Sequence, residues 1–419
     1  MKLMTWAIAA FASALCIPSL AQAAQPEVFL SLADVQRLAV ERQPALEAQA
    51  QAVAAARNSA VAAAQLPDPK LTAGVTDLPV DGADRYSLRR DDFTMFTAGV
   101  MQDFPRAAKR QLRGQKGEHE AELAEQTLAT SRLMIERDAG FAWLAVWKAE
   151  RLRELLLDAA HQADLQMQAA EIAYTTNTAP QSAVLESQVN AALLRDEAAD
   201  ADLQVRDARD QLSRWLGNEV ADRSVSPEVP TWPDPPDLPQ LLVQLRQHPH
   251  LNAEAKRVEL AEDEVALARQ AYKPDWSLAV DYGYRPDFAD FVSVNVTVDL
   301  PVFSHSRQDR ELSAKLAEQE QAELQREDMF REQESDIRRN WEALRRQQER
   351  LKQFDNDILP KSRQRIDSAL ATWQSGQGGL MSVLDARRMA LDNEMKRLEL
   401  LADAAKRQIN LQYYAGKAS

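Results

Sequence analysis

Cysteine is almost missing from this chain of 419 residues. The only cysteine, Cys16, lies in an apolar segment near the amino terminus. The rest of the sequence therefore offers no disulfide framework, no thiolate metal site and no thiol nucleophile. Phosphate-binding loops, serine nucleophile elbows and zinc-binding His-Glu-x-x-His sequences are also absent from it. We expect a protein that is not an enzyme and that carries no cofactor and no resident metal ion.

Glycine and long apolar runs are scarce as well, and basic residues are outnumbered by acidic ones. The chain has only 12 glycines and many Ala, Glu, Gln, Leu and Arg residues, a composition that favours long helices. Its formal net charge of -14 at pH 7 argues against nucleic acid as a partner. Beyond residue 23 there is no apolar run of about 18 residues, so we expect any membrane-spanning part to be a β-barrel.

The first residues have the form of a signal peptide. An apolar core over 6–17 is followed by a small-x-small cleavage sequence at 21–23. We expect a signal peptide over residues 1–23 and export from the cytoplasm. Leu15 stands directly before Cys16, where a lipoprotein signal needs a small residue, and this argues against lipidation.

The remainder of the sequence contains an internal repeat. The letters QPAL at 43–46 match HPHL at 248–251, and AVLE at 183–186 matches SVLD at 382–385. Residues 226–239, between the two halves, hold six prolines and indicate a stiff, extended linker. We therefore expect a first repeat over 24–225, a proline-rich linker over 226–239 and a second repeat over 240–419.

Each repeat is predicted to run helix, β-hairpin, long helix, helix. The first helix is expected over 32–66, with Ser31 as its N-cap, and its counterpart over 241–272. The long helix of the first repeat, 106–174, contains no proline and would measure roughly 100 Å. Apolar residues, many of them alanine, recur along it every seven residues, as in a coiled coil. A returning helix is expected over 181–216.

The hairpin strands are clearest in the second repeat. Residues 276–284 and 292–300 each alternate apolar and polar side chains over nine residues. This length suits a transmembrane strand with lipid on its apolar face and water on its polar face. A soluble sheet over a core would alternate in the same way, but the rest of the chain offers no separate core to cover it. The polar faces carry the candidate lumen residues Asp281, Asn295 and Asp299.

The number of strands indicates an oligomer. Two strands from each repeat give four strands per chain, and four strands cannot close a barrel, because about eight are needed. We therefore expect several chains to share one barrel in lipid. Three chains would supply twelve strands and a lumen wide enough for water.

At several of these positions the chain resembles the TolC-type outer-membrane efflux proteins. The likeness rests on the helix-to-strand junctions at 66–69 and 272–274, the strand ends at 103–105 and 299–303, and the turn at 376–385. It implies a mainly α fold with a transmembrane β part: a trimeric 12-stranded β-barrel in the bacterial outer membrane, continuous with a long periplasmic α-helical coiled-coil tunnel. The partners that it implies are a periplasmic adaptor (membrane fusion) protein and an inner-membrane RND pump.

One segment is most similar to a single branch of that family. Residues 101–105 (MQDFP), followed by Lys109 and Arg110, resemble the exporters of heavy-metal cations such as cobalt, zinc, cadmium, copper and silver. We therefore expect the exit duct of a tripartite RND-type efflux pump for such cations, with a duct for drugs or for type I protein secretion as the alternative. A periplasmic coiled-coil adaptor is an alternative of another class, but it should contain a compact β-domain instead of two separate hairpins.

The resemblance also implies a periplasmic gate at the helix tips. The acidic residue that lines the closed gate in the family matches Asp385, and Glu186 holds the same place in the first repeat. A ring of three carboxylates would repel anions and concentrate cations; an ordinary solvated helix charge is the alternative. Ser382 and Trp373 stand where relatives have a second acid and a latching tyrosine, so we do not expect a latch of that kind here.

Overall fold

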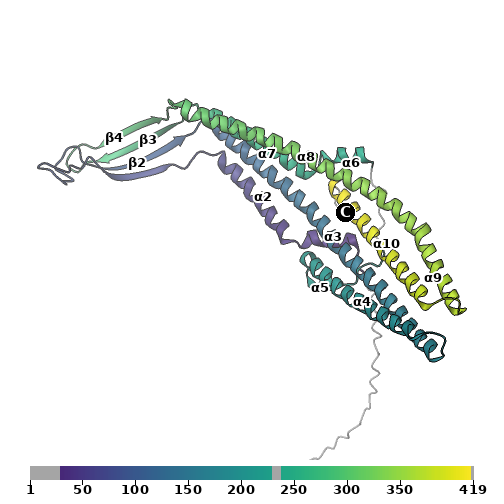
Figure 1. Cartoon of the computed structure of the whole chain (residues 1–419). Coiled ribbons are helices and arrows are strands. Elements are labelled where there is room, and N and C mark those ends of the chain that lie inside the picture. Colours follow the sequence, from purple (N-terminus) through teal and green to yellow (C-terminus); the bar gives the residue numbers. More distant parts are fainter. Residues whose placement is uncertain (1–28, 229–236, 417–419) are drawn as a thin grey trace, which may run out of the picture.

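The computed structural model describes residues 29–228 and 237–416, and the predicted signal peptide and part of the predicted linker lie outside them. The molecule is elongated, with a β-sheet at one end and two helical hairpins at the other (Figure 1). The first half of the chain forms α1 (Leu32–Arg42), α2 (Pro44–Ala63), β1 (Lys70–Thr76), β2 (Met95–Phe104), α3 (Ala107–Thr175), α4 (Gln181–Leu216) and α5 (Asn218–Ala221).

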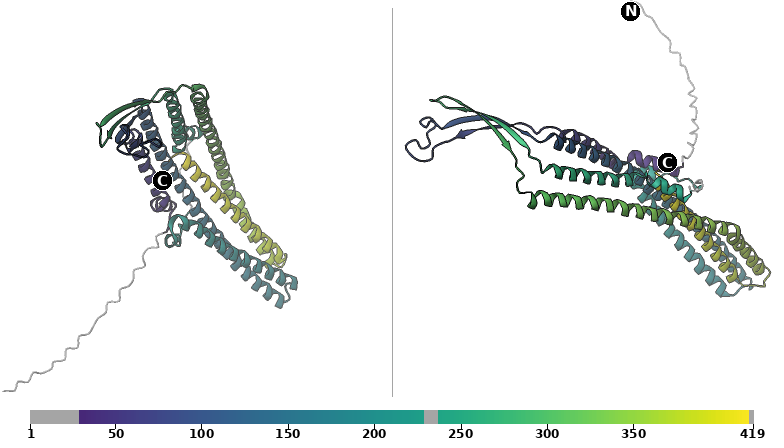
Figure 2. Two further views of the ribbon diagram at one scale, coloured as in Figure 1. Left: turned by 90° about the vertical axis from the view of Figure 1, so that its left-hand side faces the viewer. Right: turned by 90° about the horizontal axis from the view of Figure 1, so that it is seen from above.

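The second half follows the same order. It forms α6 (Leu238–Leu245), α7 (Pro249–Gln270), β3 (Trp276–Tyr284), β4 (Phe291–Val298), a short 3-10 turn η1 (Ser304–Ser306), α8 (Gln308–Gln353), a π-helical turn η2 (Phe354–Ile358), α9 (Leu359–Gln374) and α10 (Leu380–Tyr414). The helical body bends between the sheet and the tips of the hairpins (Figure 2). None of the helices in the described part of the chain is both long enough and apolar enough to cross a lipid bilayer.

The first helix of each half differs from the prediction. A continuous helix was expected over 32–66 and over 241–272, but each helix is interrupted just before a proline, at Pro44 and at Pro249. Proline lacks an N–H and forces the preceding residue into an extended conformation, as the φ of -82° and ψ of 111° at Gln43 show. The N-cap prediction is confirmed, because Ser31 Oγ accepts a hydrogen bond from the Asp34 N–H at 3.2 Å.

The long helices follow the sequence pattern closely. The 69 residues of α3 correspond to about 100 Å of helix, and α4 has the predicted bounds. Trp143 and Trp147 are buried where α3 packs against α1, α4 and α10. The Trp143 indole donates to the Leu30 carbonyl oxygen at 2.8 Å, so this large polar group is satisfied inside the core.

The described residues form one antiparallel sheet in the order β1-β2-β3-β4. The two hairpins therefore join through β2 and β3, with Phe104 opposite Trp276 and Phe96 opposite Tyr284. β3 has the predicted bounds, whereas β4 ends two residues earlier than predicted, shortly before Pro301. β1 and β4 form the two edges of the sheet, and each presents one unpaired side.

Candidate functional site: the polar strand face and the helix tips

The four strands share one apolar face, and that face is exposed. The register aligns Leu71 with Val100, Val100 with Val280, and Val280 with Val294, which places their side chains on the same side of the sheet. The exposed fraction is 80% for Leu71 and 63% for Val294. Exposing so large an apolar surface to water costs free energy, so we expect this face to contact lipid or another protein surface.

The opposite face carries the predicted lumen residues. Asp281 lies over Gly99, and a Cβ added at Gly99 would overlap its carboxylate. The Thr72 hydroxyl donates to Asp281 Oδ1 at 3.4 Å, so three strands contribute to this polar contact. Asn295 stands opposite Ala279 and is exposed.

Asp299 lies where the sheet meets the helices. Its N–H donates to the Asp275 carbonyl oxygen at 3.0 Å and so extends the ladder beyond the end of β4. The Asp275 carboxylate in turn accepts from Lys109 Nζ at 2.5 Å and from the Arg106 N–H at 3.0 Å. The strand ends are therefore fastened to the start of α3.

The helix tips are two tight turns that pack against each other. The chain leaves α3 through Asn177 and leaves α9 through Gly376, with φ of 56° and 72°, which is the left-handed region that these residue types tolerate. Behind the turns, side chains of both hairpins form one apolar cluster: Ala170, Ala183, Leu380, Val383 and Leu384. The two hairpins are therefore held together at their tips.

The predicted gate residues lie on the same two hairpins as this cluster, and no hydrogen bond or ion pair joins them to one another in the described part of the chain. Asp385 and Glu186 are exposed on different hairpins, and neither has an ion pair within residues 29–228 and 237–416. The Ser382 hydroxyl donates to the Gly379 carbonyl oxygen at 2.8 Å. Trp373 is half-buried against the apolar cluster. Asp385 and Glu186 are thus exposed carboxylates near the tips of the two hairpins.

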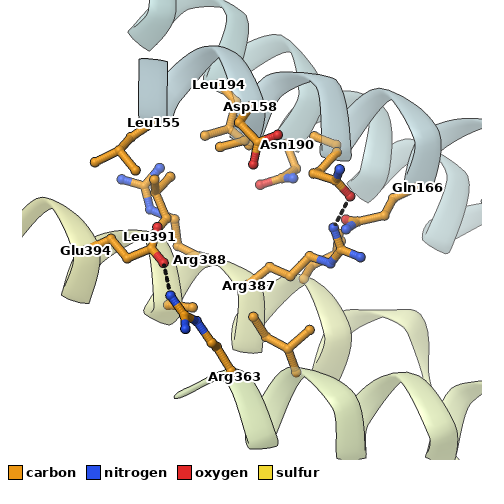
Figure 3. Close-up of a pocket in the computed structure, with 16 residues that line it drawn as sticks. Leu155, Asp158, Gln166, Asn190, Leu194, Arg363, Arg387, Arg388, Leu391 and Glu394 are labelled. Atoms are coloured by element: carbon orange, nitrogen blue, oxygen red, sulfur yellow. Dashed lines mark hydrogen bonds and ion pairs between the residues drawn. The ribbon is translucent and has the colours of Figure 1, made fainter. Parts of the chain in front are cut away.

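A cavity of about 190 Å³ between the hairpins contains residues that sequence reasoning missed. Figure 3 shows Arg387 reaching from α10 towards α3, where its guanidinium donates to Gln162 Oε1 at 2.8 Å. The Gln166 side chain lies beside the same guanidinium in Figure 3. Burial lowers the pKa of Arg387, and the charge of Asp158 opposes that shift. Arg387 therefore binds α3 through neutral amides and forms no ion pair within the described residues.

The next residue links α10 to α4. Arg388 Nη1 lies 2.7 Å from Glu197 Oε1 and its Nε lies 3.2 Å from Asp392 Oδ1. Arg387 contacts α3 and Arg388 contacts α4, so two consecutive arginines of α10 hold it to both helices of the other hairpin. These two polar contacts between the hairpins therefore lie two and three residues after Asp385 on α10.

Several solved structures share this arrangement of a long α-helical body that continues into a small sheet. The structure of a membrane protein from Pseudomonas aeruginosa matches with a TM-score of 0.81 at 16% identity, covering 92% of each chain. Residues 241–417 match the sequence profile of the family described as Outer membrane efflux protein.

Two further solved structures share the fold. The outer membrane protein VceC from Vibrio cholerae matches with a TM-score of 0.78 at 18% identity, over 92% of this chain and 96% of that one. CusC, described as forming a transmembrane channel, matches with a TM-score of 0.79 at 14% identity over 93% of both chains. Comparison with curated protein sequences gives no match.

Proposed function

We propose that the protein is a trimeric outer-membrane channel and the passive exit duct of a tripartite RND-type efflux pump. The observation that carries this proposal is the sheet, whose apolar face is exposed on all four strands and whose edges are open. In water such a sheet would aggregate through its face and edges. Lipid would cover the face, and neighbouring copies would pair with the edges.

Three copies would close the sheet into a barrel of twelve strands, with β4 of one copy beside β1 of the next. The polar face would then line the lumen and present Asp281, Asn295 and Asp299 to water. The helices would extend the duct into the periplasm towards an adaptor protein and an inner-membrane pump, which would supply the energy.

The tips would form the gate. Three copies of Asp385 around one axis make a ring of carboxylates that favours cations. Opening moves the hairpin of α9 and α10 away from that of α3 and α4, and it breaks the contact between Arg388 and Glu197. Both side chains of this ion pair are more than a third exposed, so it contributes only about 0–1 kcal/mol. An ion pair this weak would favour the closed state slightly and would still allow the gate to open.

The proposed cargo is a heavy-metal cation. The acidic side chains on the strand face and at the tips support a cationic cargo, as does the net charge of -14. The resemblance of segment 101–105 to heavy-metal exporters supports the choice of metal. In this segment Asp103 lies on the polar side of β2, with Oδ2 2.8 Å from Lys70 Nζ.

The gate is tested by ion conductance of the purified protein in planar lipid bilayers. We expect Asp385→Ala to raise the conductance severalfold, because three shorter side chains would widen the constriction at the tip. Asp403→Ala, which removes an exposed acid farther along α10, is the control and should leave conductance unchanged. An unaltered conductance for Asp385→Ala would show that this residue is not part of the gate. A processed chain that stays monomeric in water without detergent would refute the proposed channel.

A further inference from the structure

A histidine between two carboxylates lies at the contact of α3 and α7, far from the helix tips. His119 Nδ1 is 2.7 Å from Asp263 Oδ2, and His119 Nε2 is 3.2 Å from Glu259 Oε2. The side chain of Asp263 is only 5% exposed and that of His119 18%. Both ring nitrogens therefore face acceptors in a partly buried place.

A cation close to Nε2 would stabilise this arrangement. A carboxylate can only accept, so the nitrogen that faces the more buried Asp263 carries the hydrogen. In a neutral imidazole, the lone pair of Nε2 then points at the carboxylate of Glu259, which is repulsive. A metal ion between Nε2 and the Glu259 carboxylate would bind both groups and remove this repulsion.

A third carboxylate and an ammonium group complete the cluster. The ligand atoms of His119, Glu122 and Glu259 all lie within 4.8 Å of one another. Lys256 Nζ lies 2.6 Å from Glu122 Oε2 and 2.8 Å from Glu259 Oε2. Hydrogen bonds to Glu122 and Glu259 raise the pKa of Lys256, so its ammonium group is held as a cation between them. A positive charge thus already occupies the point where these oxygens meet.

We propose that His119, Glu122 and Glu259 form a divalent transition-metal site, with zinc as the best-fitting ion. Zinc accepts one imidazole nitrogen and carboxylate oxygens, and it often has three protein ligands and one open position. Asp263 would act as a positioning residue, because a carboxylate on Nδ1–H orients the ring and makes Nε2 a better ligand. The ion would displace the Lys256 ammonium group, whose long side chain is partly exposed and can turn outward.

The site follows from the packing of two helices. His119 and Glu122 are three residues apart on α3, and Glu259 and Asp263 are four apart on α7, so each pair shares one helix face. The sequence alone predicts no resident metal ion, because His119 and Asp263 are 144 positions apart and belong to no metal-binding motif. A bound ion would fasten α3 to α7 close to the sheet and would stabilise that end of the helical body.

The experiment is Zn²⁺ titration of the purified, detergent-solubilised protein by calorimetry, with Co²⁺ absorption as a second readout. We expect one ion per chain, a Zn²⁺-dependent rise in the melting temperature, and visible Co²⁺ bands of a low-coordinate site. His119→Gln should abolish these signals, and Asp263→Asn should weaken Zn²⁺ binding about 10-fold or more. His305→Gln is the control, because His305 is 92% exposed and lies elsewhere.

Lys256→Gln separates a metal site from a plain ion-pair network. It removes the competing ammonium group, so Zn²⁺ should bind several-fold more tightly, a gain that misfolding cannot produce. If wild type and Lys256→Gln bind no Zn²⁺, or if His119→Gln binds it as tightly as wild type, the proposal is wrong. These measurements do not involve transport, so a negative result would refute the metal site without refuting the proposed channel.

Discussion

His248 is a titratable side chain in the interior of the helical body, at the start of α7. It is only 1% exposed and packs edge-on against Tyr413, with ring centroids 4.9 Å apart. Its Nε2–H donates to the Tyr413 carbonyl oxygen at 3.1 Å, and its Nδ1 accepts from the His250 N–H at 3.2 Å. One donor and one acceptor describe a neutral ring, so protonation would break the N-cap contact of α7.

Stability should therefore depend on the charge of His248. Burial lowers its pKa from the ordinary 6.5 to about 4. Between these values the unfolded chain binds a proton that the folded chain does not, so the contribution is complete above pH 6.5 and is lost as the pH falls towards 4. We expect a loss of up to about 3 kcal/mol in the free energy of unfolding, measured by urea titration in detergent at several pH values.

The variant His248→Asn isolates this effect. Asparagine is a good N-cap and does not titrate, so the variant should lose less stability than wild type over the same pH range. His305→Asn, at a fully solvated histidine, should behave like wild type. Equal pH dependence in wild type and His248→Asn would show that the buried ring does not control acid stability.

At the scale of elements, local patterns predicted the strands and the long helices. Residues 276–284 alternate without interruption, and 181–216 lack any breaker, so both elements have the predicted bounds. The breaks before Pro44 and Pro249 were missed because each proline lies inside one stretch of helix-forming residues. Proline at the first position of a helix is as acceptable as proline that ends one, and the letters alone do not distinguish the two.

The contacts between the hairpins could not be predicted in this way. The hydrogen bond from Arg387 to Gln162 joins positions 225 apart, and nothing periodic in either helix indicates it. The sequence supplied Asp385 and Ser382 through resemblance alone, and their roles in the gate stay predictions. Whether an arginine faces solvent or joins two helices depends on how the helices pack, and the sequence pattern does not show this.

The contact between α2 and α3 gives a test of packing at this scale. A Cβ added at Gly117 of α3 would lie 2.5 Å from the Ala60 Cα of α2, whereas one at Gly114 would lie 3.0 Å from the Ala64 Cβ. Gly117→Ala therefore forces α2 and α3 apart and should cost about 1–3 kcal/mol, more than the gain in helix propensity of about 1 kcal/mol. Gly114→Ala meets only a methyl group and should cost clearly less.

Urea unfolding of the two variants in detergent measures this difference. They change the same residue type on the same helix, one turn apart, against the same partner helix. The propensity gain is therefore matched, and any difference reports the approach of the two backbones. A Gly114→Ala variant as unstable as Gly117→Ala would contradict this account of the contact.

For the whole molecule, the decisive question is what covers the two faces of the sheet. Val294 and Asn295 are neighbours on β4, they point to opposite faces, and both are exposed in the single chain. In a protein surrounded by water, lysine at either position would be almost equally harmless. In the proposed trimer one position meets lipid and the other meets the water of the lumen.

We therefore expect Val294→Lys to impair assembly and Asn295→Lys to be tolerated. A lysine on the lipid face near the middle of a bilayer costs about 2–4 kcal/mol, and three copies of the chain would triple that cost per trimer. The measurement is the yield of detergent-resistant trimer recovered from outer membranes, compared with total expressed protein. Equal yields for the two variants would mean that both faces meet water, and the sheet would then not be a wall between lipid and a lumen.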